Sequence, residues 1–152
     1  MKQAVPAADI ERVIDAALAE DIGAGDVTSD ALLPPDSVMN LVMRARQEIV
    51  VAGIDVALAV FRRLAPDADI KVVASDGDRA QAGAELMRLD GPARGLLTAE
   101  RTALNLVQLL SGIATMTRQY VDAIDGTGAV LLDTRKTIPG LRSLSKYATR
   151  MG

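Results

Sequence analysis

A change in hydrophobic periodicity near residue 95 constrains the fold of this chain more than any other feature of its sequence. Before that point, apolar and polar residues alternate in 37–47 and 69–78, which is typical of half-buried strands, and 54–64 has helical spacing. After it, residues 96–110 carry the apolar stripe of a long amphipathic helix. The mixture of strand and helix signals predicts an α/β (α+β) protein.

Polar residues and glycines indicate where the helices begin and end. Asp9 is the predicted N-cap of a first helix. Thr98 is the predicted N-cap of the long helix, which would place Arg101 in its first turn. Ser111 and Gly112 predict a break, after which a second helix begins.

A short apolar run from Gly128 to Thr134 predicts a buried strand in the last part of the sequence. A Pro-Gly turn follows, and then residues 140–151 predict a helix. This order resembles the opening unit of a parallel α/β array. One strand cannot form an array, so we expect its neighbours to come from a continuation of the chain or from another chain.

Composition removes several classes of function. The sequence contains no histidine and no cysteine, which excludes disulfides, thiolate catalysis and Cys/His metal sites within this chain. A net charge of −3 and an aromatic content of 2% argue against nucleic-acid binding. No apolar run approaches the ~20 residues that span a bilayer, so we expect no membrane association and a cytoplasmic location.

The charge is distributed unevenly along the chain. Residues 130–152 carry a net charge of +4, whereas the other residues together carry −7. A basic final segment in an acidic protein indicates a local anion site, although a solvated helix face explains the same charges.

Three polar residues follow the predicted last strand directly: Thr134, Arg135 and Lys136. In α/β barrels, reactive residues lie at the C-terminal ends of strands. Arginine grips a carboxylate with two parallel hydrogen bonds, and lysine is a compact charge suited to phosphate. The pair therefore predicts an anionic ligand, unless Asp133 and nearby glutamates neutralise it.

The stretch "DGDRAQAGAEL" resembles the hammerhead fold of biotinyl and lipoyl carriers. Such a carrier needs a modifiable lysine at a hairpin tip, and no lysine lies between Asp76 and Leu96. We expect a carrier-like scaffold without carrier function, and a non-catalytic hammerhead interaction module remains an alternative.

Four stretches together closely resemble the quinolinate phosphoribosyltransferase family: "EDIGAGDVTS", "DGD…G", "LLTAERTALNLVQLLSGIAT" and "LDTRKTIPGLRSLSKYATRMG". The resemblance implies an N-terminal open α/β sandwich domain with a linking helix over residues 1–110. It implies the first βα unit of an incomplete α/β barrel over residues 111–152.

The family transfers phosphoribose from phosphoribosyl pyrophosphate to quinolinate, with Mg²⁺, and forms nicotinate mononucleotide, pyrophosphate and carbon dioxide. The resemblance implies that Arg135 and Lys136 bind quinolinate and phosphoribosyl pyrophosphate, with Thr134 beside them. It implies a homodimer in which Arg101 reaches the partner's active site. No catalytic residue and no metal ligand is assigned within this chain.

The family continues beyond the matching stretches with a Gly-Gly-x-x-Asn-His-Arg segment, a further lysine and acidic residues. We therefore expect this chain to represent the N-terminal half of the enzyme and to be inactive alone. A related transferase-like protein associated with molybdenum uptake is the alternative within the same fold.

Overall fold

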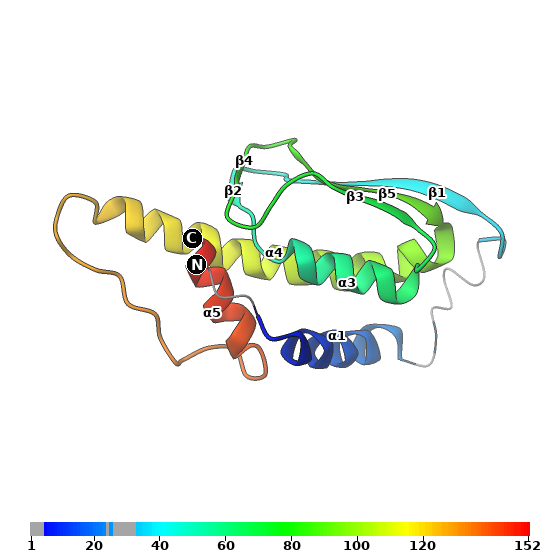
Figure 1. The fold of residues 1–152 in the computed structure, drawn as a ribbon, viewed down its shortest axis with the longest axis horizontal. Helices are drawn as coiled ribbons and strands as arrows, with labels where there is room; N and C mark the ends of the chain where they lie inside the picture. Colours follow the sequence, from blue (N-terminus) through cyan, green and yellow to red (C-terminus); the bar gives the residue numbers. More distant parts are fainter. Residues whose placement is uncertain (1–4, 24, 26–32) are drawn as a thin grey trace.

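A computed structural model describes residues 5–23, 25 and 33–152 of the chain, and it is a mixed α/β fold (Figure 1). Two antiparallel sheets are present, one with strand order β1-β5-β3 and one with order β2-β4. The strands are β1 (Val38–Arg44), β2 (Ile49–Val50), β3 (Asp69–Val72), β4 (Arg79–Ala80) and β5 (Glu85–Pro92). The helices are α1 (Ala7–Ile22), α3 (Ile54–Leu64), α4 (Ala93–Ala123) and α5 (Arg142–Met151). The expected mixed α/β class is confirmed.

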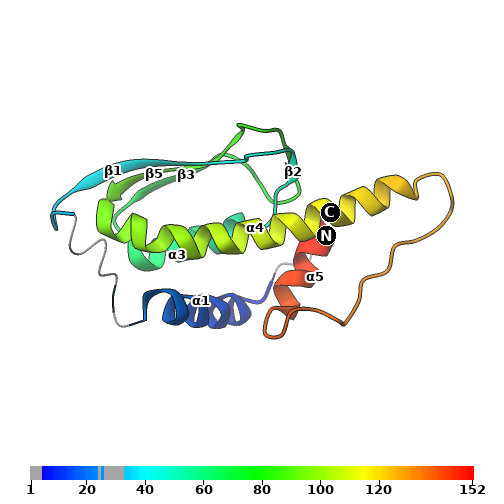
Figure 2. The same cartoon turned by 180° about the vertical axis from the view of Figure 1, so that it is seen from behind.

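The elements form layers, which both views show (Figures 1 and 2). The β1-β5-β3 sheet covers one side of α3 and α4, and α1 lies on the opposite side of these two helices. The alternation predicted in 37–47 is confirmed, because Met43 pairs with Met87 and both side chains are buried. Each large apolar side chain buried in this way contributes about 1.5–3 kcal/mol to stability.

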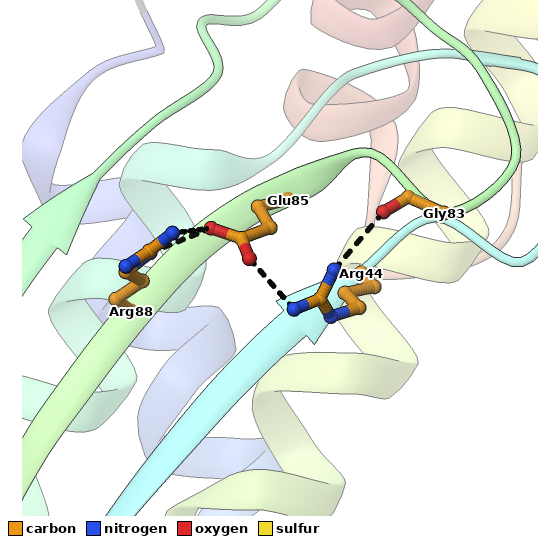
Figure 3. A network of polar contacts seen from close by, with 4 residues as sticks. All are labelled: Arg44, Gly83, Glu85 and Arg88. Atoms are coloured by element: carbon orange, nitrogen blue, oxygen red, sulfur yellow. Dashed lines mark hydrogen bonds and ion pairs between the residues drawn. The ribbon is translucent and has the colours of Figure 1, made fainter.

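Charged residues on β1 and β5 make a small surface network (Figure 3). The Glu85 carboxylate accepts hydrogen bonds from Arg44 at 2.6 Å and from Arg88 at 2.6 Å. Arg44 also donates to the backbone carbonyl of Gly83 at 3.3 Å. Both arginine side chains are more than half exposed, at 53% and 61%, so each ion pair contributes only about 0–1 kcal/mol.

The break predicted at Ser111 and Gly112 is wrong, because α4 is one helix of 31 residues. The Ser111 hydroxyl accepts a hydrogen bond from the Ala52 amide at 3.0 Å and donates to the Ala52 carbonyl at 3.2 Å. One turn later, the Thr115 hydroxyl accepts from the Val50 amide at 2.9 Å. These hydrogen bonds to Ala52 and Val50 hold the helix on both sides of Gly112. They outweigh the weak helix propensity of glycine.

The predicted start of α4 is also wrong. The helix begins at Ala93, directly after Pro92, and not at Thr98. The Thr98 hydroxyl instead donates to the Arg94 carbonyl at 2.9 Å, one turn back within the helix. Arg101 therefore lies two turns inside α4 and not in its first turn. Strand β5 ends at Pro92 and α4 follows without a loop, so the helix begins five residues before Thr98.

The start of the first helix differs from its prediction by a few residues. α1 begins at Ala7 after Pro6, so Asp9 lies in the first turn and makes no N-cap hydrogen bond. Its carboxylate still lies near the positive end of the helix dipole. The stretch "EDIGAGDVTS", residues 20–29, lies partly outside the described residues, because residues 24 and 26–29 belong to the undescribed part.

The strand predicted over Gly128–Thr134 does not form. Val130 is 79% exposed and Leu132 is 83% exposed, and in the described part of the chain no strand pairs with them. A strand needs a neighbour for its backbone hydrogen bonds, so these residues stay irregular despite their apolar sequence. Residues 124–141, called the connecting segment here, run from the end of α4 back to α5 (Figure 1).

None of the helices in the described ranges combines the length and the apolar character that a membrane crossing requires.

Candidate anion-binding site

A tight turn ends the connecting segment. The Leu141 amide donates to the Ile138 carbonyl at 3.1 Å, with Pro139 and Gly140 between them. Gly140 has φ +81°, a conformation that a type II turn requires at its third position and that glycine adopts without strain. The Pro-Gly pair thus reverses the chain immediately before α5.

The two predicted cations lie on the exposed part of the connecting segment. Arg135 and Lys136 are both exposed, and Thr134 beside them accepts a hydrogen bond from the Lys136 amide at 3.1 Å. Among the residues that the structure describes, neither cationic side chain makes a hydrogen bond or an ion pair. The pair is therefore accessible to an external anion.

Asp133 does not neutralise these cations. Its carboxylate pairs with Lys146 Nζ on α5 at 2.5 Å, and the two side chains are 31% and 34% exposed. Lys146 thus neutralises the acidic residue that is nearest in sequence to Arg135 and Lys136. Arg142, at the start of α5, is exposed like Arg135 and Lys136 and adds to the positive charge of this region.

A groove of about 570 Å³ lies between α4 and the connecting segment. Residues from α4 and from the middle of the segment share its lining, namely Gln108, Leu109, Gly112, Ile113, Met116, Thr117, Tyr120 and Leu131–Thr134, together with Thr149 of α5. Its walls are mostly apolar, and Thr134 lies at its edge, next to the cations.

Arg101 lies apart from the other predicted site residues. Its guanidinium pairs with Asp21 at 3.0 Å, and its side chain is 73% exposed. Asp21 is near the C-terminal end of α1, whereas Arg12 near the N-terminal end contacts Gly140 of the connecting segment. Arg12 and Asp21 are nine positions apart on α1, which is about 14 Å along the helix axis. The structure therefore does not bring Arg101 together with Thr134, Arg135 and Lys136 within one chain.

A carboxylate in the loop before β4 joins three parts of the fold. Asp76 accepts hydrogen bonds from the amides of Gly53 and Ile54, each at 2.9 Å, and so caps α3. The Tyr147 hydroxyl of α5 donates to the same carboxylate at 2.7 Å. Burial, together with the hydrogen bond to Asp76, raises the pKa of Tyr147 above its ordinary value.

Replacing Tyr147 by phenylalanine should remove this link between α5 and α3. We expect Tyr147→Phe to lower the free energy of unfolding by about 1 kcal/mol at pH 7, because Asp76 loses one donor. The folded-state pKa is raised, so the stabilisation is complete below pH about 10 and declines as the pH rises further. Urea unfolding from pH 8 to 11 should show the variant and wild type converging; a constant difference would contradict this assignment.

No metal site is evident in the described part of the chain, where no group of three His, Cys, Asp or Glu side chains converges. The acidic side chains near the candidate cations do not form a magnesium site either, since Asp133 is paired with Lys146. The described residues of this region therefore do not fit a protein-bound Mg²⁺.

Two interactions at the site had no signal in the sequence. Asp76 and Tyr147 are 71 positions apart, and Arg12 and Gly140 are 128 positions apart. The Asp-Gly turn at Asp76 is visible as a turn, but a carboxylate that caps a helix from outside that helix is not. Only the folded arrangement of α1, α3 and α5 brings these residues together.

The mixed α/β fold resembles solved structures of nicotinate-nucleotide pyrophosphorylases. A nicotinate-nucleotide pyrophosphorylase from Francisella tularensis superposes with a TM-score of 0.93 at 40% identity, over 98% of this chain and 52% of that one. NadC from Streptococcus pyogenes gives a TM-score of 0.93 at 36% identity, over 99% of this chain and 53% of that one.

Sequence comparison gives the same result. The carboxylating nicotinate-nucleotide pyrophosphorylase of Mycobacterium leprae is 49% identical over 139 residues, which is 90% of this chain and 49% of the relative. The profile described as "Quinolinate phosphoribosyl transferase, N-terminal domain" matches residues 26–111, and that of the C-terminal domain matches residues 113–152. The chain belongs to the quinolinate phosphoribosyltransferase family. It spans about half the length of the curated relatives it matches.

Proposed function

We propose that this chain forms the N-terminal part of an enzyme that transfers phosphoribose from phosphoribosyl pyrophosphate to quinolinate. The products are nicotinate mononucleotide, pyrophosphate and carbon dioxide, as in the biosynthesis of NAD. In this proposal, residues 1–110 are an open, hammerhead-like α/β sandwich with a linking helix. Residues 111–152 are the start of an α/β barrel, whose first strand would be Gly128–Thr134 once neighbouring strands are present.

The proposal rests on the accessibility of two cations in the connecting segment, Arg135 and Lys136, which are unpaired within the described residues. Both substrates are anions, so their site needs fixed positive charge within a protein of net charge −3. Arg135 suits a quinolinate carboxylate, because its planar guanidinium donates two parallel hydrogen bonds. Lys136 suits a phosphate oxygen of phosphoribosyl pyrophosphate, and Thr134 supplies a hydroxyl beside both.

Charge moves at two centres during the proposed reaction. The pyridine nitrogen forms a bond to the ribose carbon while pyrophosphate leaves with the electron pair of the broken C–O bond, and positive charge develops at that carbon. Carbon dioxide then leaves the pyridine ring, whose carbon keeps the electron pair of the broken C–C bond and takes up a proton from water. Cations fixed beside the carboxylates and the phosphates stabilise this negative charge without reorganising, which is an effective way to lower a barrier.

We further propose that the enzyme is a homodimer in which Arg101 acts in the partner's site. Within one chain, Arg101 lies at the opposite end of α1 from the Gly140 contact, so it needs a second copy to meet Arg135. The Arg101 side chain is 73% exposed and that of Asp21 is 21% exposed, so their ion pair contributes about 1 kcal/mol. Arg101 can therefore exchange Asp21 for a substrate carboxylate at a small cost in free energy.

A completed chain tests the proposed function. We expect residues 1–152 alone to form no nicotinate mononucleotide, because the cations lie on an open segment with no opposite wall. Joining this chain to the remaining half of the Mycobacterium leprae relative should give a transferase that requires both substrates. Product formation is measured by chromatography, and pyrophosphate release provides a second readout.

Folding of the joined chain is checked by circular dichroism and by its melting temperature. A folded joined chain that releases no pyrophosphate and binds no quinolinate would contradict the proposal. Activity of residues 1–152 alone would contradict the expected need for the second half.

A further inference from the structure

Two side-chain contacts, one at each end, join residues 133–140 of the connecting segment to helices α5 and α1. At one end, Asp133 pairs with Lys146 of α5 at 2.5 Å. At the other end, the Gly140 carbonyl accepts a hydrogen bond from Arg12 of α1 at 2.9 Å. The residues that bear the candidate cations lie between these two contacts and belong to no helix or strand. Their position therefore depends on how the two ends are held.

The contact at Gly140 is part of a larger arrangement on α1. Asp9 lies one turn before Arg12, and its carboxylate accepts a hydrogen bond from the Ser143 hydroxyl at 2.5 Å. The same carboxylate lies 3.9 Å from the Arg12 guanidinium, which orients the arginine toward the turn. The first turns of α1 thus hold both the Pro-Gly turn and the start of α5.

We propose that Arg12 is a positioning residue for Arg135 and Lys136, with Lys146 holding the opposite end of the segment. The inference rests on the proposed function, in which these two cations bind the anionic substrates. Arg12 itself contacts no substrate in this account, because its guanidinium is bound to the backbone of the turn. It acts by keeping the segment in the arrangement that presents both cations together.

The expected size of the effect follows from the fraction of molecules in which the segment is correctly placed. A segment that is correctly placed for only a fraction of the time binds its ligand more weakly by that fraction. The Arg12 side chain is 55% exposed, so its contact with Gly140 is worth little more than a surface interaction. We therefore expect loss of Arg12 to weaken anion binding about three- to tenfold, and not to abolish it.

Arg44 offers a matched control. Its side chain is 53% exposed, close to the 55% of Arg12, and it also donates to the carbonyl of a glycine, Gly83 (Figure 3). Gly83 lies in the loop between β4 and β5, away from the connecting segment. Arg44→Ala removes one positive charge from the protein, as Arg12→Ala does, so it separates local positioning from a general loss of attraction for anions.

The experiment compares wild-type residues 1–152 with Arg12→Ala, Arg12→Lys and Arg44→Ala, each checked for an unchanged melting temperature. Amide hydrogen exchange of Lys136 and Leu141, whose amides donate to Thr134 and Ile138, is measured by NMR without ligand. Quinolinate and inorganic pyrophosphate are then titrated separately, and the amide shifts of Arg135 and Lys136 give the dissociation constants.

We expect Arg12→Ala to speed exchange of the Leu141 amide, which closes the Pro-Gly turn, about three- to tenfold and to weaken binding of both anions by a similar factor. Arg12→Lys keeps a donor and a charge, so it should recover part of each effect. Arg44→Ala should behave like wild type in both measurements.

The outcomes separate the two proposals. Unchanged exchange and unchanged affinity in Arg12→Ala overturn the positioning role, as does an equal effect of Arg44→Ala. Faster exchange in Arg12→Ala, with no binding of either anion to wild type at millimolar concentration, supports the positioning of the segment. That result would argue against the proposed function of the cations themselves.

Discussion

Arg101→Ala and Arg135→Ala variants of the completed chain should each be inactive as homodimers, and mixing them should restore up to about a quarter of wild-type activity by random pairing. Each homodimer lacks one arginine in both pockets, and loss of one such donor reduces turnover about 10²–10³-fold. A mixed dimer has one pocket with both defects and one pocket with none. Random pairing makes half of the dimers mixed, and each of these has one working pocket.

The double variant Arg101→Ala/Arg135→Ala is the control for this experiment. Mixed with an equal amount of wild type, it damages both pockets of every mixed dimer, so re-association should lower the activity from about half to about a quarter of the wild-type value. Subunit exchange is verified by mass spectrometry of differently tagged chains. If verified mixed dimers of the two single variants stay inactive, Arg101 does not act across an interface, and its pair with Asp21 is an ordinary surface contact.

Two glycines of α4 should respond to alanine in opposite directions. A Cβ atom at Gly95 would lie 2.3 Å from the Leu64 carbonyl oxygen at the end of α3, whereas one at Gly112 would meet nothing within 4 Å. Gly95→Ala should therefore reduce the free energy of unfolding by about 3 kcal/mol, because a backbone oxygen and the two helices would have to separate. Gly112→Ala should increase it by up to about 1 kcal/mol, because alanine favours helix.

Both variants gain helix propensity within the same helix, so the difference between them reports mainly the contact of residue 95 with Leu64 and Ala65. Urea unfolding followed by circular dichroism measures both values. A Gly95→Ala variant as stable as wild type would show that α3 and α4 tolerate a wider separation than the structure indicates.

Local patterns predicted those elements whose partners are close in the sequence or whose faces are strongly one-sided. The strand at 37–47 and the helix at 54–64 were found from alternation and from helical spacing. Thr98 and the Ser111-Gly112 pair failed as boundary signals, because the contacts of α4 with β2, β5 and α3 outweigh preferences worth about 1 kcal/mol.

The strand expected over Gly128–Thr134 shows the limit of apolar pattern as a signal. The residues are suited to a buried strand, but a strand forms only where a second strand accepts and donates its backbone hydrogen bonds. The described structure has no such neighbour for them. The sequence indicates Arg135 and Lys136 as candidates for an anion site, and this role stays a prediction. The contacts that hold their segment, from Arg12 and from Lys146, depend on the fold and had no local signal.

The uninterrupted course of α4 has a consequence for how sequences of this kind can diverge. The helix carries Arg101 near one end and packs against α5 near Ala114, where the Gly152 backbone approaches closely. Inserting or deleting one residue between these positions would rotate everything beyond it by about 100° and shift it by about 1.5 Å. Substitutions along this stretch can accumulate one at a time, whereas a change in its length would misalign Arg101 and the α5 contact in a single step. We therefore expect the spacing between Arg101 and Ala114 to be inherited as a fixed length.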